Sequence, residues 1–138
     1  MGTTEQSDEK VVYLTLDDGP SKNTQAVLDI LDKYNAKATF FVTGAMPEYK
    51  DMIKKAYDKG HTIGMHTYSH DYAKVYASVD AYFQDLDQIG QLVKEEIGYV
   101  PCFYQISGRI FEYHICKLHE GNYDNAYAGG SGKRISIL

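Results

Sequence analysis

The sequence lacks the features that mark several large classes of protein. No apolar run in its 138 residues approaches the ~20 residues of a membrane-spanning helix, so we expect no membrane span. An excess of basic residues is also lacking: 14 lysines and arginines against 19 acidic residues give a net charge of −5, which argues against nucleic acid as a partner. The only cysteines, Cys102 and Cys116, share no pairing motif, so neither a disulfide nor a cysteine-bound zinc ion is favoured.

What is present indicates a folded, water-soluble domain. Hydrophobic residues make up 43% and charged residues 24% of the chain, which excludes intrinsic disorder. Residues 1–9 are polar and lack the apolar segment of a signal peptide, so we expect a leader outside the fold. Tryptophan is absent while tyrosine occurs 13 times, a composition that is compatible with sugar binding without being diagnostic of it.

Short apolar runs alternate with helical stripes over the first two-thirds of the chain. Strands are predicted at residues 10–16, 38–42 and 61–65 and from residue 102, with a turn at 17–20. Helices are predicted at residues 23–35, 47–59 and 78–97, each with an apolar stripe at helical spacing. This alternation predicts an α/β fold with a parallel sheet, either open or part of a (β/α) barrel.

Four polar side chains follow strands of this predicted sheet. Asp17 and Asp18 come after the first strand, while His66 follows the third and His70 lies four residues further on. The carboxyl ends of parallel strands meet at one edge of a sheet, where ligands of α/β proteins commonly bind. We therefore expect all four side chains to lie close together.

Their joint placement indicates a metal site. Asp-Asp-Gly-Pro by itself is more often a turn, and His-x-x-x-His by itself is more often a pair of surface histidines. Together at one sheet edge, two imidazoles and a carboxylate are ligands suited to zinc or another divalent transition ion. The second carboxylate can then act as a general base on a water molecule beside the ion.

These segments resemble two motifs of a known family. Thr15–Pro20 (TLDDGP) resembles the first motif of the polysaccharide deacetylases, carbohydrate esterase family 4, and His66–His70 (HTYSH) resembles the second. Pro101–Tyr104 (PCFY) is similar to the run that leads into the third motif. The resemblance covers residues 10–104.

The resemblance implies a role for each matched residue. Asp17 would be the catalytic base, Asp18, His66 and His70 would bind the metal, and Thr67 would hold the histidine loop by hydrogen bonds. The implied reaction is metal-dependent hydrolysis of N-acetyl, or O-acetyl, groups on a polysaccharide such as peptidoglycan or chitin-like oligomers. Zinc is the expected ion, with cobalt or nickel as alternatives. The family also implies an extracytoplasmic location, for which the chain shows no export signal.

The resemblance ends at residue 105. The third motif should read Arg-x-Pro, whereas Gln105–Arg109 reads QISGR, and the later Asp-Trp and Leu-x-His motifs are missing. With a permitted choice of codons for residues 105–113, reading one base later gives Arg-Phe-Pro-Gly-Gly-Ser-Ser-Asn, which contains Arg-x-Pro at the expected place. We hypothesise that residues from about 105 onward are translated out of frame.

The predicted organisation has three parts. Residues 1–9 form the leader, residues 10–104 form the N-terminal part of a deacetylase domain, and residues 105–138 form a divergent tail. The expected architecture is a partial (β/α) barrel whose C-terminal half is missing or has diverged. Two alternatives stay open: a non-catalytic remnant that retains the metal site, and an unrelated oxygenase with a two-histidine, one-carboxylate iron centre.

Overall fold

A computed structural model describes residues 10, 12–105, 112–114 and 134–137 of the chain. The strands are β1 (Tyr13–Gly19), β2 (Thr39–Val42), β3 (Thr62–Met65), β4 (Phe103–Gln105), β5 (Glu112–His114) and β6 (Arg134–Ile137). The helices are α1 (Thr24–Lys33), the 3₁₀ turn η1 (Pro47–Tyr49), α2 (Asp51–Asp58), α3 (Tyr72–Val75) and α4 (Val79–Ile97).

The described strands form one sheet in the order β5-β4-β3-β2-β1-β6. Strands β1 to β4 run parallel to one another, which confirms the predicted parallel α/β sheet. The tail, for which no strand was predicted, contributes the two outer strands. β6 pairs with β1 in parallel, whereas β5 pairs with β4 in the antiparallel direction.

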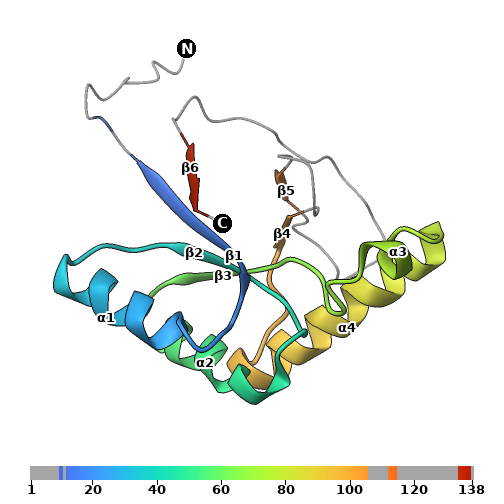
Figure 1. The fold of residues 1–138 in the computed structure, drawn as a ribbon, viewed down its shortest axis with the longest axis horizontal. Helices are drawn as coiled ribbons and strands as arrows, with labels where there is room; N and C mark the ends of the chain where they lie inside the picture. The colour runs from blue at the N-terminus through green and yellow to red at the C-terminus, as the bar shows by residue number, and fades with distance from the viewer. Residues whose placement is uncertain (1–9, 11, 106–111, 115–133, 138) are drawn as a thin grey trace, which may run out of the picture.

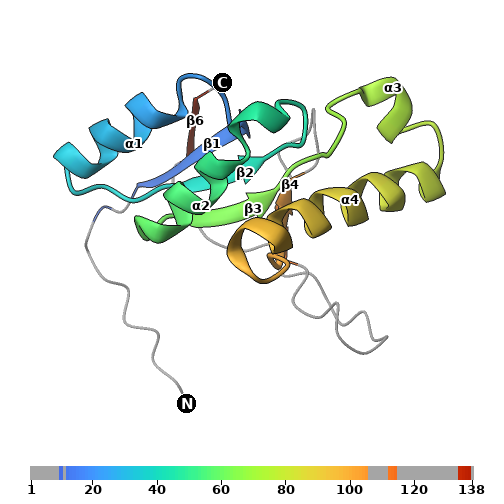
Figure 2. The same ribbon diagram turned by 90° about the horizontal axis from the view of Figure 1, so that it is seen from below.

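The three long helices cover one face of this sheet (Figures 1 and 2). A single apolar core joins them to alternate residues of β2 and β3, whose side chains point to this face. Helices on one face only are the arrangement of a (β/α) barrel segment rather than of a doubly wound sheet. The core comprises Leu28, Leu31, Ala38, Phe40, Val42, Ile53, Ala56, Ile63, Met65, Leu86, Ile89 and Val93.

The helix ends follow ordinary capping chemistry, with some departures from the predicted stripes. α4 begins where the Ser78 hydroxyl accepts a hydrogen bond from the backbone N–H of Ala81, and it ends at Gly98 with a φ of 89°. Three residues that follow the predicted apolar spacing of the helices, Val79, Phe83 and Tyr34, are exposed. Within the described part of the chain, no helix is long and apolar enough to cross a membrane.

Two predicted element boundaries are wrong. The first strand does not end at residue 16 with a turn; instead β1 continues through Gly19. The predicted helix at 47–59 is divided into the 3₁₀ turn η1 and the α-helix α2, because the residue between them, Lys50, serves as the end of one and the N-cap of the other. The short helix α3 was not predicted at all.

Candidate metal centre

A β-bulge places the two aspartates at the edge of the sheet. Leu16 pairs with Phe40 and Gly19 with Val42, so Asp17 and Asp18 together oppose a single residue of β2. Consecutive side chains of a regular strand point to opposite faces. The bulge, with Asp18 in the left-handed region at a φ of 64°, interrupts this alternation at the two aspartates.

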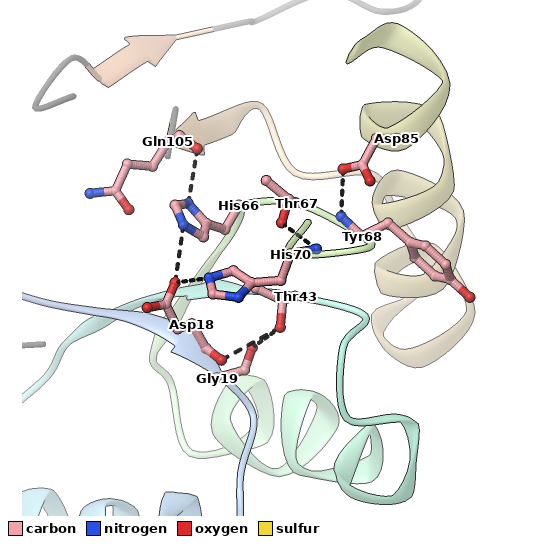
Figure 3. Close-up of polar contacts among 9 residues, drawn as sticks. All are labelled: Asp18, Gly19, Thr43, His66, Thr67, Tyr68, His70, Asp85 and Gln105. Atoms are coloured by element: carbon pink, nitrogen blue, oxygen red, sulfur yellow. Dashed lines mark hydrogen bonds and ion pairs between the residues drawn. The ribbon is translucent and has the colours of Figure 1, made fainter. Parts of the chain in front are cut away.

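A buried threonine fixes the end of the bulged strand. Thr43, which directly follows β2, is only 2% exposed. Its backbone N–H donates to the carbonyl of Gly19 at 2.6 Å, and its hydroxyl donates to the same oxygen at 3.3 Å (Figure 3). The strand that carries Asp18 is therefore held to the neighbouring strand immediately after the aspartate.

The histidines come from β3 and the loop after it. His66 continues the sheet, since its backbone N–H donates to the carbonyl of Val42 at 2.9 Å. The loop then bends back, and the Thr67 hydroxyl accepts a hydrogen bond from the backbone N–H of His70 at 3.0 Å. His70 adopts a φ of 52°, so two of the three candidate metal ligands have left-handed backbones, a form of strain that is often found at functional sites.

Three side chains converge on one point (Figure 3). The Nε2 atoms of His66 and His70 lie 3.1 and 3.0 Å from the same oxygen of Asp18. Among the described residues, Asp18, His66 and His70 form the one group of potential ligand atoms close enough together to hold a metal ion. The His66 side chain is 5% exposed, whereas those of His70 and Asp18 are 33% and 45% exposed, so the group opens to solvent on one side.

The spacing fits a divalent transition ion. Zinc holds nitrogen and oxygen ligands at about 2.0–2.2 Å in a tetrahedron, which separates two ligand atoms by about 3.3 Å. The observed separations of 3.0 and 3.1 Å are within a few tenths of an ångström of this value. Three protein ligands with an open side leave a position for water or substrate, as in catalytic rather than structural zinc sites.

The hydrogen bond on the far side of the His66 ring prepares the ring for a metal ion. Nδ1 lies 3.0 Å from the backbone carbonyl of Gln105, in β4. A carbonyl oxygen only accepts hydrogen bonds, so Nδ1 carries the proton and donates it. In the neutral ring, Nε2 then presents a lone pair towards Asp18, which is the tautomer that binds a metal ion.

An acidic residue of α4 holds the loop between the two histidines. The Asp85 carboxylate accepts hydrogen bonds from the backbone N–H groups of Tyr68 and Ser69 at 2.7 and 2.9 Å, and the residue is 8% exposed. The loop also packs closely on Gly44, where an added Cβ would come within 2.5 Å of the Tyr68 ring. These contacts fix the direction in which His70 leaves the loop.

The structure brings together most of the residues that the sequence singled out. Asp18, His66 and His70 meet, Thr67 bonds within the histidine loop, and Asp17 directly precedes Asp18 in the bulge. Sequence reasoning missed Asp85, Thr43 and the Gln105 carbonyl. Asp85 could have been found as an acid within the apolar stripe of its helix, and Thr43 as a polar residue at a strand end, whereas a backbone carbonyl leaves no signal in the sequence.

Comparison with known proteins gives consistent matches. The family model for polysaccharide deacetylase matches residues 4–108. A peptidoglycan-N-acetylglucosamine deacetylase of Bacillus cereus is 40% identical over 95 residues, covering 68% of this chain and 34% of that protein. The solved catalytic domain of a peptidoglycan N-acetylglucosamine deacetylase from Eubacterium rectale is 46% identical with a TM-score of 0.71, covering 72% of this chain and 45% of that one. The chitin deacetylase structure from the fungal pathogen Colletotrichum lindemuthianum is 30% identical with a TM-score of 0.62. This match covers 69% of this chain and 44% of that one.

Fold and site together define an α/β protein with two histidines and a carboxylate at the carboxyl edge of a parallel sheet. The chain belongs to the polysaccharide deacetylase family, as the resemblance implied. This membership excludes the unrelated oxygenase. The chain spans about a third of the curated relative's length and less than half of the two solved structures.

Proposed function

We propose that this chain carries the metal centre of a deacetylase that hydrolyses N-acetyl, or O-acetyl, groups on a glycan. The convergence of Asp18, His66 and His70 carries the proposal, and a second aspartate, Asp17, directly precedes Asp18 in the bulge. Asp18, His66 and His70 would hold a divalent ion, which would supply Lewis-acid activation of water and of the acetyl carbonyl. Zinc suits the donor set best, with cobalt or nickel as alternatives.

The remaining chemistry falls to the chain's own side chains. Asp17 is half-buried next to the ligand Asp18, and its carboxylate takes the proton of the attacking water. Thr67 and Asp85 act on geometry, because their hydrogen bonds keep the histidine loop in one conformation. A fixed loop keeps both imidazoles in position without reorganisation when substrate binds.

The proposed substrate class is an N-acetylated polysaccharide. One of the similar proteins is a peptidoglycan-N-acetylglucosamine deacetylase and another is a chitin deacetylase, and both peptidoglycan and chitin contain N-acetylglucosamine. A cell-wall substrate would place the reaction outside the cytoplasm.

Acetate release tests the proposal. The full chain, loaded with zinc and incubated with an N-acetylglucosamine oligomer, is expected to release acetate. Asp17→Asn removes the base while it preserves the size of the side chain, so the rate should fall about a hundredfold or more. Asp29→Asn, which changes an exposed aspartate of α1, should leave the rate unchanged.

Two outcomes would count against the proposal. A wild-type rate of acetate release in Asp17→Asn would show that Asp17 is not the general base. Zinc binding without acetate release from any N-acetylated oligomer would contradict the proposed catalysis and leave the non-catalytic remnant as the better interpretation.

A further inference from the structure

A row of aromatic side chains begins at the candidate metal ligand His70 and runs away from the site. The His70 ring lies 5.6 Å from Tyr72, and Tyr72 lies 6.4 Å from Tyr76. The row continues from Tyr76 to Tyr82 at 6.2 Å and ends on Phe83. It crosses from α3 to the first turns of α4, two helices that lie side by side (Figure 1).

The rings of this row are open to solvent. Tyr72 is 50% exposed, and Tyr76 and Phe83 are each 47% exposed. The rings of Tyr72, Tyr76 and Tyr82 are nearly parallel, with interplanar angles of 29° and 19°. Their centroids lie well beyond the ~3.5–4.0 Å separation of directly stacked rings, so neighbouring rings do not cover one another face to face.

The middle of the row is anchored in the protein. Tyr82 is half-buried and packs against the hydrophobic core, as does Tyr104 beside it. Burial raises the pKa of the Tyr82 phenol, and contact with Tyr104 adds to the rise, so this side chain stays neutral. Tyr72 and Tyr76 therefore extend from a fixed ring, and ligands bind with less loss of entropy to such a preorganised surface.

This surface matches the chemistry of a polysaccharide strand. The C–H faces of pyranose rings pack on aromatic rings, and successive sugars of an extended chain repeat at a distance comparable to the spacing of these rings. Tyrosine hydroxyls at the edges can bond to sugar hydroxyls and acetamido groups. The row starts at a ligand of the proposed reaction centre, so sugars next to the reacting unit would lie on it.

We infer that Tyr72, Tyr76, Tyr82 and Phe83 form a binding surface for the sugar units that flank the acetylated unit at the metal centre. The inference rests on the proposed function, because the polysaccharide is taken to run from the metal centre along the row of rings. Binding of the sugars to these rings needs no metal. The surface would make the protein select extended N-acetylated chains over single sugars.

Binding of a glycan to metal-free protein tests this surface separately from catalysis. We expect the full chain, stripped of metal with a chelator, to bind an N-acetylglucosamine hexamer at least about tenfold more tightly than the monomer by isothermal titration calorimetry. The double variant Tyr72→Ala/Tyr76→Ala should weaken hexamer binding about tenfold. Tyr72→Phe/Tyr76→Phe, which keeps the rings, should retain most of the affinity.

Matched variants distinguish the surface from a general effect of tyrosine loss. Tyr34→Ala removes an exposed tyrosine at the far end of α1 and should bind the hexamer like wild type. Phe83→Ala sits in a long helix that tolerates alanine, so it tests the row if the double variant does not fold. Wild-type hexamer affinity in the folded alanine variants, or no preference of wild type for the hexamer, would overturn the inference. Hexamer binding without acetate release on zinc addition would contradict the proposed function alone.

Discussion

At the scale of single residues, the buried Asp85 is the side chain whose loss should cost most outside the metal ligands. Its carboxylate accepts two backbone N–H groups of the histidine loop. In Asp85→Asn an amide NH2 group replaces one of the two acceptor oxygens and faces a backbone N–H donor. The free energy of unfolding should therefore fall by about 1–3 kcal/mol. The zinc affinity should fall about tenfold, since the loop positions His70.

Denaturant unfolding and zinc titration measure the two effects. Asp87→Asn, at an exposed position of the same helix, is the matched control and should change neither quantity. If Asp85→Asn lowered stability but bound zinc with the wild-type affinity, Asp85 would be a structural residue and not a positioning one.

A second residue, His61, should make stability depend on pH. Its ring is buried, and Nδ1 accepts a hydrogen bond from the backbone N–H of Ala38 at 3.3 Å. Burial lowers the pKa of His61, and the Lys37 and Lys59 cations lower it further, while Asp32 opposes them. The neutral ring therefore contributes stability that is present above the unfolded pKa of about 6.5 and is lost as the pH falls towards the folded pKa.

Urea unfolding between roughly pH 8 and pH 5 should show this loss. The free energy of unfolding of wild type should decrease across that range more steeply than that of His61→Gln, which cannot titrate. Identical pH profiles for the two proteins would show that His61 does not titrate in this way.

At the scale of elements, α1 and α4, two of the three predicted helices, differ in how they begin. Ser78 caps α4 through its hydroxyl, whereas Asn23, at the start of α1, makes no capping hydrogen bond with its side chain. Ser78→Ala should therefore lower the free energy of unfolding by about 1 kcal/mol, and Asn23→Ala should cost clearly less. Thermal unfolding of both variants measures the difference, and equal losses would contradict the capping assignment.

The sequence was sufficient for the order of elements but not for the shape of the site. Apolar periodicity located β1 to β4 and the helices α1 and α4, because each of these elements buries one regular face. Periodicity does not report an irregular backbone, so the bulge at Asp17 and Asp18 was predicted as a turn. Side chains that act on backbone groups, such as Asp85 and Thr43, were missed because their partners carry no sequence signature.

At the scale of the whole molecule, the sheet departs from the barrel pattern after β4, close to the end of the residues 4–108 that match the family model. Residues 106–111 separate β4 from β5, which is too short for a parallel crossover, and β5 accordingly pairs in the antiparallel direction. At the end of β4, the buried side-chain oxygen of Gln105 receives no hydrogen bond from the described residues. Both features fit a segment that was not selected for this position.

We therefore expect the gene to contain a one-base shift near codon 105. Nucleotide sequencing across codons 100–110 should reveal a frame in which a single-base change restores Arg-x-Pro after the β4 strand. If no single-base change yields a deacetylase frame, the hypothesis is wrong, and residues 105–138 would be a true divergence of this chain.

Zinc stoichiometry tests the proposed metal centre most directly. Isothermal titration of the metal-free full chain should show one zinc ion bound per chain, with binding lost in His66→Ala and in His70→Ala. His119→Ala, which changes a histidine outside the matched motifs, should bind zinc like wild type. One ion per chain in both the His66 and His70 variants, with unchanged affinity, would contradict a metal centre formed by Asp18, His66 and His70.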